Sequence, residues 1–320
     1  MADISLILCK NDNAYDISQL VESIKWKGRK GSAARSINVT LVDTDKIQSG
    51  IDVTRGDRLV FLLDKKELFR GIIMSQQQSD SSKMSVTAYD NGIYLANNKD
   101  TFVYENKTLH DIFIDVCKRF DVKYSDVAAT SYKIPELTKS KTTAWDVMLD
   151  AISQDFKATG TKYYVQSSKG ILRLFKRKEN IIQWVLDDSI NLISYNYKKS
   201  IENIKTRLKI LSGEDQVYAV KKDAELEKKI GIFQDIDKKD DDLTEAKLNE
   251  QINETFKEIS TPEISLTAES VGIPDVISGV GVYMRIKKLG IERTFWVDED
   301  THTFKGDTHR MNLTLNSVNE

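Results

Sequence analysis

The first hundred residues place apolar and polar side chains in alternation within short runs. In RSINVTLVD (35–43), every second residue from Ile37 onward is apolar. This period of two is typical of a strand with one face on a core. Similar runs lie at 4–10, 21–28, 58–64, 67–76 and 83–90, with turn-rich segments between several of them. Short strands at this spacing predict a small antiparallel β-barrel or sandwich over residues 1–100.

The period changes at residue 108. Apolar residues recur at spacings of three and four over 109–120 and again over 145–156, so each stretch predicts a helix. Thr108 and Thr143 each stand three residues before an aspartate, close to a capping-box arrangement. A hairpin at 162–177, with a glycine in its turn, follows the second helix. We therefore predict a small α+β domain over 101–180.

Strand-like runs return from residue 181 and continue to the end of the chain. They include 203–211 and 216–222, and they are interrupted at about 222–260 by an acid-rich, helix-favouring stretch. In that stretch Leu248, Ile252, Phe256 and Ile259 form an apolar stripe, and Asp242 precedes Glu245 at capping distance. These features predict a second β-barrel over 181–320 with a helical insertion. The expected fold class is α+β, mainly β.

One short unit occurs twice in the chain. The segments DVTRG (52–56) and DVISG (275–279) both lead directly into a predicted strand. Two further matches follow in order, Phe69–Ile73 with Glu292–Trp296 and Lys83–Thr87 with Arg310–Thr314, and the offset grows only from 223 to 227. In each copy the glycine can take the positive φ that a tight turn needs. The ordered matches favour two similar small barrels in tandem over coincidence.

Composition narrows the function classes. The chain has 320 residues, of which 30% are charged, and a net charge of −2. This balance is typical of a folded protein rather than of a disordered one or a basic coat for nucleic acid. Cys9 and Cys117 stand alone in apolar runs, so we expect buried, reduced thiols. We expect no signal peptide and no membrane span, because no long apolar segment occurs.

The search for chemistry finds no catalytic motif. Neither copy of the repeat carries a phosphate-binding glycine pattern, and no G-x-S-x-G is present. His302 and His309, with acidic residues in 298–309, are the candidate metal ligands, but that segment falls where the repeat predicts a hairpin loop. Trp26, Trp184 and Trp296 are expected in the core. We predict no catalytic residue, no cofactor and no metal.

A family resemblance is carried by three segments. In IKWKGRKGSAARSINVTL (24–41) the matching residues are Trp26, Gly28, Ala33, Ala34 and Arg35, and in VTAYDNGIYLANN (86–98) they are Tyr89 and Asp90. The segments RGDRLVFLLDKKELFRGII and KTLHDIFIDVCKRFDV (107–122) match as well. The chain thereby resembles the baseplate hub proteins of contractile phage tails and phage-tail-like bacteriocins, in particular the XkdQ/YqbQ-like family.

The resemblance implies a non-enzymatic trimer in which six barrels form a pseudo-sixfold ring. Such a ring would adapt a sixfold tail tube to a threefold central spike. It implies the tube, spike, tape-measure and other baseplate proteins as partners, and DNA passing through the channel in a true phage. It also implies synthesis in the bacterial cytoplasm and incorporation into a tail or tail-like particle. Two alternatives stay open: a tail-associated cell-wall hydrolase, and a carbohydrate-binding β-protein with tryptophans exposed on one barrel face.

Overall fold

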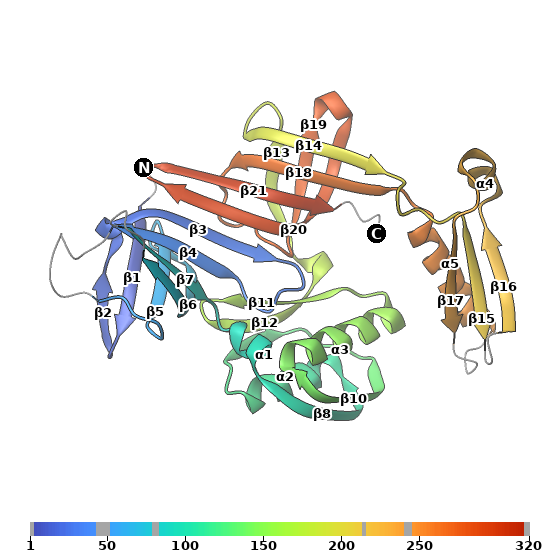
Figure 1. The fold of residues 1–320 in the computed structure, drawn as a ribbon, viewed down its shortest axis with the longest axis horizontal. Coiled ribbons are helices and arrows are strands. Elements are labelled where there is room, and N and C mark those ends of the chain that lie inside the picture. Colours follow the sequence, from blue (N-terminus) through green and yellow to red (C-terminus); the bar gives the residue numbers. More distant parts are fainter. Residues whose placement is uncertain (1–2, 43–51, 79–82, 213–215, 240–244, 317–320) are drawn as a thin grey trace. The chain divides into compact units, whose positions relative to one another are not determined.

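The computed structural model describes residues 3–42, 52–78, 83–212, 216–239 and 245–316. Contacts within the chain divide it into two compact units. The larger unit holds the chain up to residue 195 and again from residue 267, and the smaller unit holds residues 196–266. Figure 1 shows both units as ribbons.

The first half of the long sheet comes from the first hundred residues. Its strands are β1 (Ile4–Lys10), β2 (Asn13–Asp16), β3 (Val21–Arg29), β4 (Ser36–Val42), β5 (Arg58–Leu63), β6 (Lys66–Gln78) and β7 (Lys83–Tyr89). All neighbouring pairs in this part are antiparallel. Strand β3 shows the expected alternation at its end, where Ile24, Trp26 and Gly28 are buried and the residues between them are exposed. We call residues 3–89 the first β-repeat.

The second half of the same sheet comes from the C-terminal part of the chain. Its strands are β13 (Ile181–Asp187), β14 (Leu192–Ser200), β18 (Glu263–Val271), β19 (Gly281–Ile286), β20 (Ile291–Lys305) and β21 (Thr308–Asn316). Strand β20 pairs with β3, which makes one sheet in the order β14-β18-β21-β20-β3-β4-β7-β6-β5-β1-β2. We call these six strands and their connections, apart from residues 201–262, the second β-repeat. The mainly β, α+β fold class is confirmed, and the division into two barrels stays a prediction.

An α+β region lies between the two repeats in the sequence. It contains α1 (Ile93–Asn97), α2 (Leu109–Arg119) and α3 (Ala144–Thr159), with β8 (Lys99–Thr108) paired to β10 (Lys133–Thr143). Strands β9 (Tyr124–Val127), β11 (Tyr163–Ser168) and β12 (Ile171–Lys176) form a third, small sheet. Both expected helix starts are present, because the side chains of Thr108 and Thr143 accept hydrogen bonds from Asp111 N and Asp146 N. The β8–β10 pair was not foreseen.

The smaller unit differs from the helical insertion that the sequence predicts. Strands β15 (Arg207–Ser212), β16 (Gln216–Lys222) and β17 (Gln234–Lys239) form a separate three-stranded sheet. The segments at 203–211 and 216–222 therefore belong to this unit and not to a second barrel. Helices α4 (Ala224–Ile230) and α5 (Glu245–Ile259) lie in the predicted helical stretch, and Leu248, Ile252 and Phe256 pack on β15. Asp242 lies outside the described residues.

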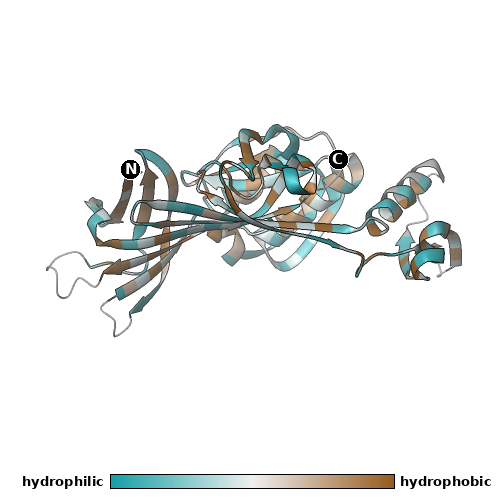
Figure 2. Cartoon of the chain, turned by 90° about the horizontal axis from the view of Figure 1, so that it is seen from above, coloured by the Kyte–Doolittle hydropathy of each residue, from teal (hydrophilic) through white to brown (hydrophobic). Residues whose placement is uncertain are grey.

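Hydropathy follows this arrangement. Brown and teal segments alternate along the strands of the long sheet in Figure 2, as expected for strands with one face on a core. Most buried apolar side chains of the first β-repeat form one cluster, and Phe304 of β20, which is buried, belongs to that cluster. Residues from both repeats therefore share one core.

The repeated motif forms the same turn in both copies. Gly56 has φ +96° and Gly279 has φ +94°, each at the third position of a four-residue turn. The turns are closed by Asp57 N to Thr54 O and by Val280 N to Ile277 O, both at 3.2 Å. A positive φ at this position is typical of a type II turn and favours glycine. The motif thus forms the turn that leads into a strand.

Hydrogen bonds to the next strand also repeat. Gly56 N donates to Ile73 O at 2.9 Å, and Gly279 N donates to Val297 O at 2.9 Å. The amides of Ile73 and Val297 donate back to Asp57 O and Val280 O. The two copies therefore share their backbone geometry as well as their sequence pattern.

The structure corrects one part of the repeat alignment. Arg58 pairs with Ile72, whereas Gly281, 223 positions later, pairs with Trp296. The equivalence between β6 and β20 is therefore an offset of 224, so the sequence match of Phe69–Ile73 with Glu292–Trp296 is wrong by one residue. The third match holds at 227, because Ile73 pairs with Ala88 and Val297 with Leu315. Each strand has a bulge at the same place, at Met74 and at Asp298.

The two turn glycines yield a stability prediction. Gly56→Ala and Gly279→Ala should each lower the free energy of unfolding by about 1–2 kcal/mol, because alanine is strained at positive φ. No atom lies within 4 Å of a Cβ built on Gly56, so backbone strain alone acts there. Chemical denaturation measures the loss. Gly56→Asn is the matched control and should lose less, since asparagine tolerates positive φ better; equal losses for both variants would contradict the turn assignment.

Candidate functional site: a buried polar cluster between the repeats

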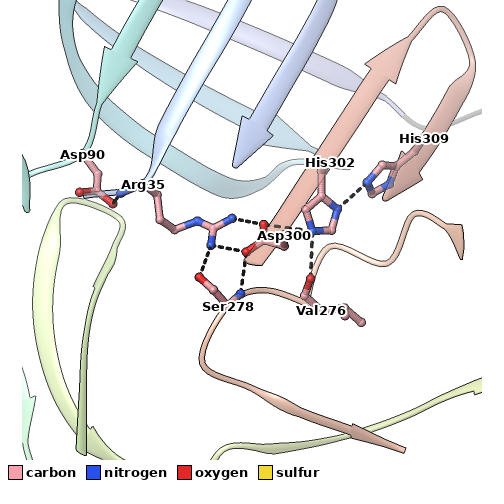
Figure 3. Close-up of polar contacts among 7 residues, drawn as sticks. All are labelled: Arg35, Asp90, Val276, Ser278, Asp300, His302 and His309. Atoms are coloured by element: carbon pink, nitrogen blue, oxygen red, sulfur yellow. Dashed lines mark hydrogen bonds and ion pairs between the residues drawn. The ribbon is translucent and has the colours of Figure 1, made fainter. Parts of the chain in front are cut away.

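Five polar residues meet where the two repeats join. Arg35 comes from the first β-repeat, directly before β4, while Ser278, Asp300, His302 and His309 come from the second. Figure 3 shows their side chains converging on the strand pair β20–β3. We call these five residues the inter-repeat cluster.

An ion pair lies at the centre of the cluster. Arg35 Nη1 donates to Asp300 Oδ1 at 2.8 Å and Arg35 Nη2 donates to Asp300 Oδ2 at 2.5 Å. Arg35 is 7% exposed and Asp300 2% exposed, so water barely screens the pair. A bidentate arginine–carboxylate contact fixes the orientation of both groups as well as their distance. It joins the two repeats through side chains.

The repeated turn is part of this arrangement. Ser278 occupies the position before Gly279, and its backbone N donates to Asp300 Oδ1 at 2.6 Å. Its hydroxyl accepts a hydrogen bond from Arg35 Nη1 at 3.1 Å. The D-V-x-x-G turn of the second repeat is therefore held against the ion pair.

Two residues of β3 enclose the Arg35 guanidinium, one by leaving space for it and one by covering its face. A Cβ on Gly28 would lie 2.0 Å from Arg35 Nη1, so no larger residue fits while Arg35 keeps this position. The Trp26 ring lies on its other side, 4.4 Å from Arg35 Cζ, a cation–π distance. In the β20–β3 register Gly28 is opposite Asp300 and Trp26 is opposite His302. This explains why Trp26, Gly28 and Arg35 occur together in the sequence.

The backbone of Arg35 extends the network to the α+β region. Arg35 N donates to Asp90 Oδ2 and Asp90 N donates to Arg35 O, both at 3.1 Å. Asp90 Oδ1 also accepts from Gly92 N at 2.9 Å, at the start of α1. Burial raises the pKa of Asp90 to about 7, although both N–H donors and the Arg35 charge oppose the rise. Tyr89 is thus the last residue of β7, and Asp90 lies between β7 and the start of α1.

The two histidines bind each other. His302 Nε2 lies 3.0 Å from Val276 O, a carbonyl that can only accept, so His302 donates from Nε2. Its Nδ1 then accepts from His309 Nε2 at 3.0 Å. Burial lowers the pKa of His302 to about 4 and of His309 to about 3, so both rings are neutral at pH 7. Asp300, 3.6 Å from His302, favours the charged ring but does not offset the burial.

The structure places these histidines differently from the hairpin loop that the sequence predicts. His302 lies within β20 and His309 within β21, and His309 pairs with Phe304. The loop is therefore shorter than expected, because the two strands continue to Lys305 and Thr308. His302 Nδ1 and His309 Nε2 are both used by the hydrogen bond between the two rings. In the described part of the chain no group of three or more His, Cys, Asp or Glu side chains could hold a metal ion.

Other candidate residues lie outside the cluster. Trp26 and Trp296 are buried as expected, but Trp184 is 48% exposed, so its assignment to the core was wrong. Three of the four tryptophans are buried, counting Trp145, so Trp184 is the one exposed tryptophan. Cys117 is buried, and burial raises its thiol pKa to about 12, whereas Cys9 is only half-buried. Both thiols are free.

Sequence reasoning identified Arg35 but missed its partners. One local signal was available: Asp300, His302 and Phe304 alternate along β20, and all three are buried. Polar residues in the core phase of a strand require buried partners. The pairing of Asp300 with Arg35, 265 positions away, could not be read from that signal alone.

The fold matches that of solved tail proteins. A 43 kDa tail protein of prophage MuSo2 from Shewanella oneidensis superposes with a TM-score of 0.73 over 97% of both chains, at 13% identity. The long β-sheet and the α+β region of this chain thus have the fold of a phage tail protein.

The family follows from closer relatives. The chain belongs to the YqbQ-like family, whose model matches residues 24–316. It is 33% identical over 314 residues to the phage-like element PBSX protein XkdQ of Bacillus subtilis, covering 97% of this chain and 96% of XkdQ. It is 32% identical over 299 residues to the uncharacterized protein YqbQ of the same organism, covering 92% and 91% of the two chains. The resemblance found in the sequence is confirmed.

Among the helices of the described ranges, none combines the length and the apolar character that a transmembrane helix needs.

Removing one partner of the central ion pair should be strongly destabilising. Arg35→Met or Asp300→Leu leaves one buried charge without its counter-ion, so each should lower the free energy of unfolding by about 3–5 kcal/mol. The double variant should lose clearly less than the sum of the two losses. Urea unfolding of the four proteins measures this coupling. Arg310→Ala is the control, because it breaks an exposed pair with Glu269 and should cost at most about 1 kcal/mol; an additive double variant would contradict the account.

The buried histidines predict a pH dependence of stability. Because the folded pKa of His302 lies below that of the unfolded chain, the unfolded state binds the extra proton between about pH 6.5 and pH 4. Wild type should therefore lose about 2 kcal/mol relative to His302→Asn between pH 7 and pH 4.5. Asp90 has a raised pKa and the opposite slope, but it is present in both proteins and cancels in the difference. A difference that does not change with pH would show that His302 is not buried as a neutral ring.

Proposed function

We propose that this chain is the hub subunit of a phage or phage-like baseplate. Three copies form a ring that presents six β-repeats around a central channel. The ring adapts the sixfold tail tube to a threefold central spike. The function is architectural and uses no cofactor.

The observation that carries this proposal is the duplication inside one subunit. The two repeats share a turn with the same glycine φ, the same strand-entry hydrogen bonds and a bulge at the same position. They also lie in one continuous sheet, joined by β20 and β3. A trimer of such a subunit would contain six near-equivalent units.

Symmetry gives this duplication a purpose. Identical contacts cannot satisfy a sixfold surface on one side and a threefold surface on the other. A trimer of duplicated subunits removes the conflict, because its six repeats can meet six tube subunits while its three chains meet three spike subunits. Differences between the two repeats would then affect only the contacts with the spike.

The proposal names further partners and a place of action. The tape-measure protein and other baseplate proteins would contact the ring, and in a true phage DNA would pass through its channel. The net charge of −2 adds no support of its own for a DNA contact. The subunit would be made in the bacterial cytoplasm and incorporated into the tail. The particle could be a phage, a defective prophage or a bacteriocin.

Light scattering on the purified full-length chain tests the proposal. We expect a molar mass three times that of one subunit, stable on dilution, since a closed ring has no free ends. A mass that rises continuously with concentration would indicate an open filament. A monomer at every soluble concentration would contradict the hub function.

A further inference from the structure

The strand order of the long sheet contains the same series twice. In the second repeat the order is β14-β18-β21-β20, and in the first it is β3-β4-β7-β6. The equivalences β20 with β6 and β21 with β7 follow from the shared turn and bulge. Position in the order then makes β14 the equivalent of β3 and β18 the equivalent of β4.

One junction between the two series is visible in the chain. The C-terminal part of β20, Glu299–Phe304, pairs with β3 on the edge that β19 occupies further back along the strand. The equivalent part of β6 is Ser75–Gln78, beyond the point where β5 ends its pairing. In the described residues this part of β6 pairs with β7, and no described strand pairs with its other edge. Its equivalence to β20 indicates that a β3-like strand fits there.

The strand that would fit is β14, the equivalent of β3. Within the described residues β14 pairs with β18, and it stands at the end of the strand order. An edge strand of this kind offers unpaired backbone N–H and C=O groups to another strand. Strand β6 is the equivalent of β20, and β14 is the equivalent of β3. The free edges of β6 and β14 therefore match each other in the way that the paired edges of β20 and β3 do.

Exposed apolar side chains accompany the β14 edge. They lie in β13, in the turn that follows it and in β14 itself, and they are between 39% and 78% exposed: Ile181, Trp184, Val185, Ile190 and Ile193. We call them the apolar strip. Asn191 Nδ2 donates to Val185 O and Asp187 N donates to Asn191 Oδ1, so the turn holds the start of β14 to β13. Five such residues within thirteen positions are typical of an interaction surface.

The β6 edge is neutral where its counterpart is charged. At the bulge of β20, Asp298 accepts Lys30 N at 2.7 Å through its carbonyl and faces Lys30 Nζ at 3.7 Å through its carboxylate. The equivalent bulge residue of β6 is Met74, which is 45% exposed. Gln76 likewise stands where β20 has Asp300. The β6 edge thus lacks the acidic groups of the internal junction, and Met74 is its exposed apolar residue.

We infer that β6 of one subunit pairs antiparallel with β14 of the next, and that the apolar strip is covered by a second copy of this chain. The contact is head-to-tail, because it uses two different edges. Three such contacts would alternate with three internal β20–β3 junctions and close the series into a ring. This inference rests on the proposed trimeric hub and specifies its subunit interface.

Single substitutions on the two edges test the interface. Met74→Lys and Ile193→Lys place a charge on exposed positions, so each subunit should keep its melting temperature. Each variant should associate at least ten-fold more weakly than wild type in sedimentation experiments, since a lysine on an edge opposes strand pairing. Val103→Lys, at an exposed apolar position of β8 outside the repeats, is the matched control and should remain trimeric.

Mixing the two variants tests the head-to-tail geometry. The Met74→Lys chain keeps an intact β14 edge and the Ile193→Lys chain keeps an intact β6 edge, so an equal mixture should form a dimer with one copy of each. A symmetric interface would show no such rescue. A wild-type trimer that persists in both single variants would overturn this interface while leaving the hub function standing. A wild type that never associates would overturn both.

Discussion

Everything at the junction of the two repeats is arranged around one buried ion pair. Arg35 and Asp300 are almost inaccessible to water, so each is tolerated only because the other is present. That constraint fixes what surrounds it. Gly28 lacks a side chain so that the guanidinium fits, Trp26 covers its face, and the Ser278 turn donates its N–H to the carboxylate. The pair thus determines the register in which β20 meets β3 and the position of the second repeat's first turn.

The fold was predictable from sequence where its causes are local. Period-two alternation located the strands of the first repeat, and the cap residues Thr108 and Thr143 located α2 and α3. The features that were missed depend on distant pairing. The sheet of 196–266, the β8–β10 pair and the contact of Arg35 with Asp300 are decided by which strands meet, and alternation alone does not encode that. The one-residue error in the repeat alignment arose because the connections between equivalent strands differ in length.

In the candidate site, too, some residues were identified from the sequence and their contacts were not. Arg35 stood out through the family motif, and the histidines stood out through their residue type. Burial lowers the pKa of both histidines, and the two rings are hydrogen-bonded to each other. Trp184, expected in the core, is exposed beside β14 and belongs to the apolar strip. A tryptophan in a strand predicts burial, but whether the covering surface comes from the same chain or from a neighbour is a property of the assembly.

The two kinds of junction also differ in their polar groups. The internal one carries a buried ion pair, so it forms as each subunit folds. The inferred one joins neutral and apolar edges, with Gln76 where the other has Asp300. Subunits would therefore fold completely before the ring closes, and near-equivalent geometry need not mean equal affinity.

The central claim is that one duplicated subunit supplies six near-equivalent positions in a ring of three. A cryo-electron microscopy map of the purified assembly tests it most directly. The account predicts six β5-β6-β7-like meanders at steps of about 60° around one axis, alternately joined by β20–β3 and by β6–β14. A threefold map in which the second repeats lie outside the ring formed by the first would contradict it.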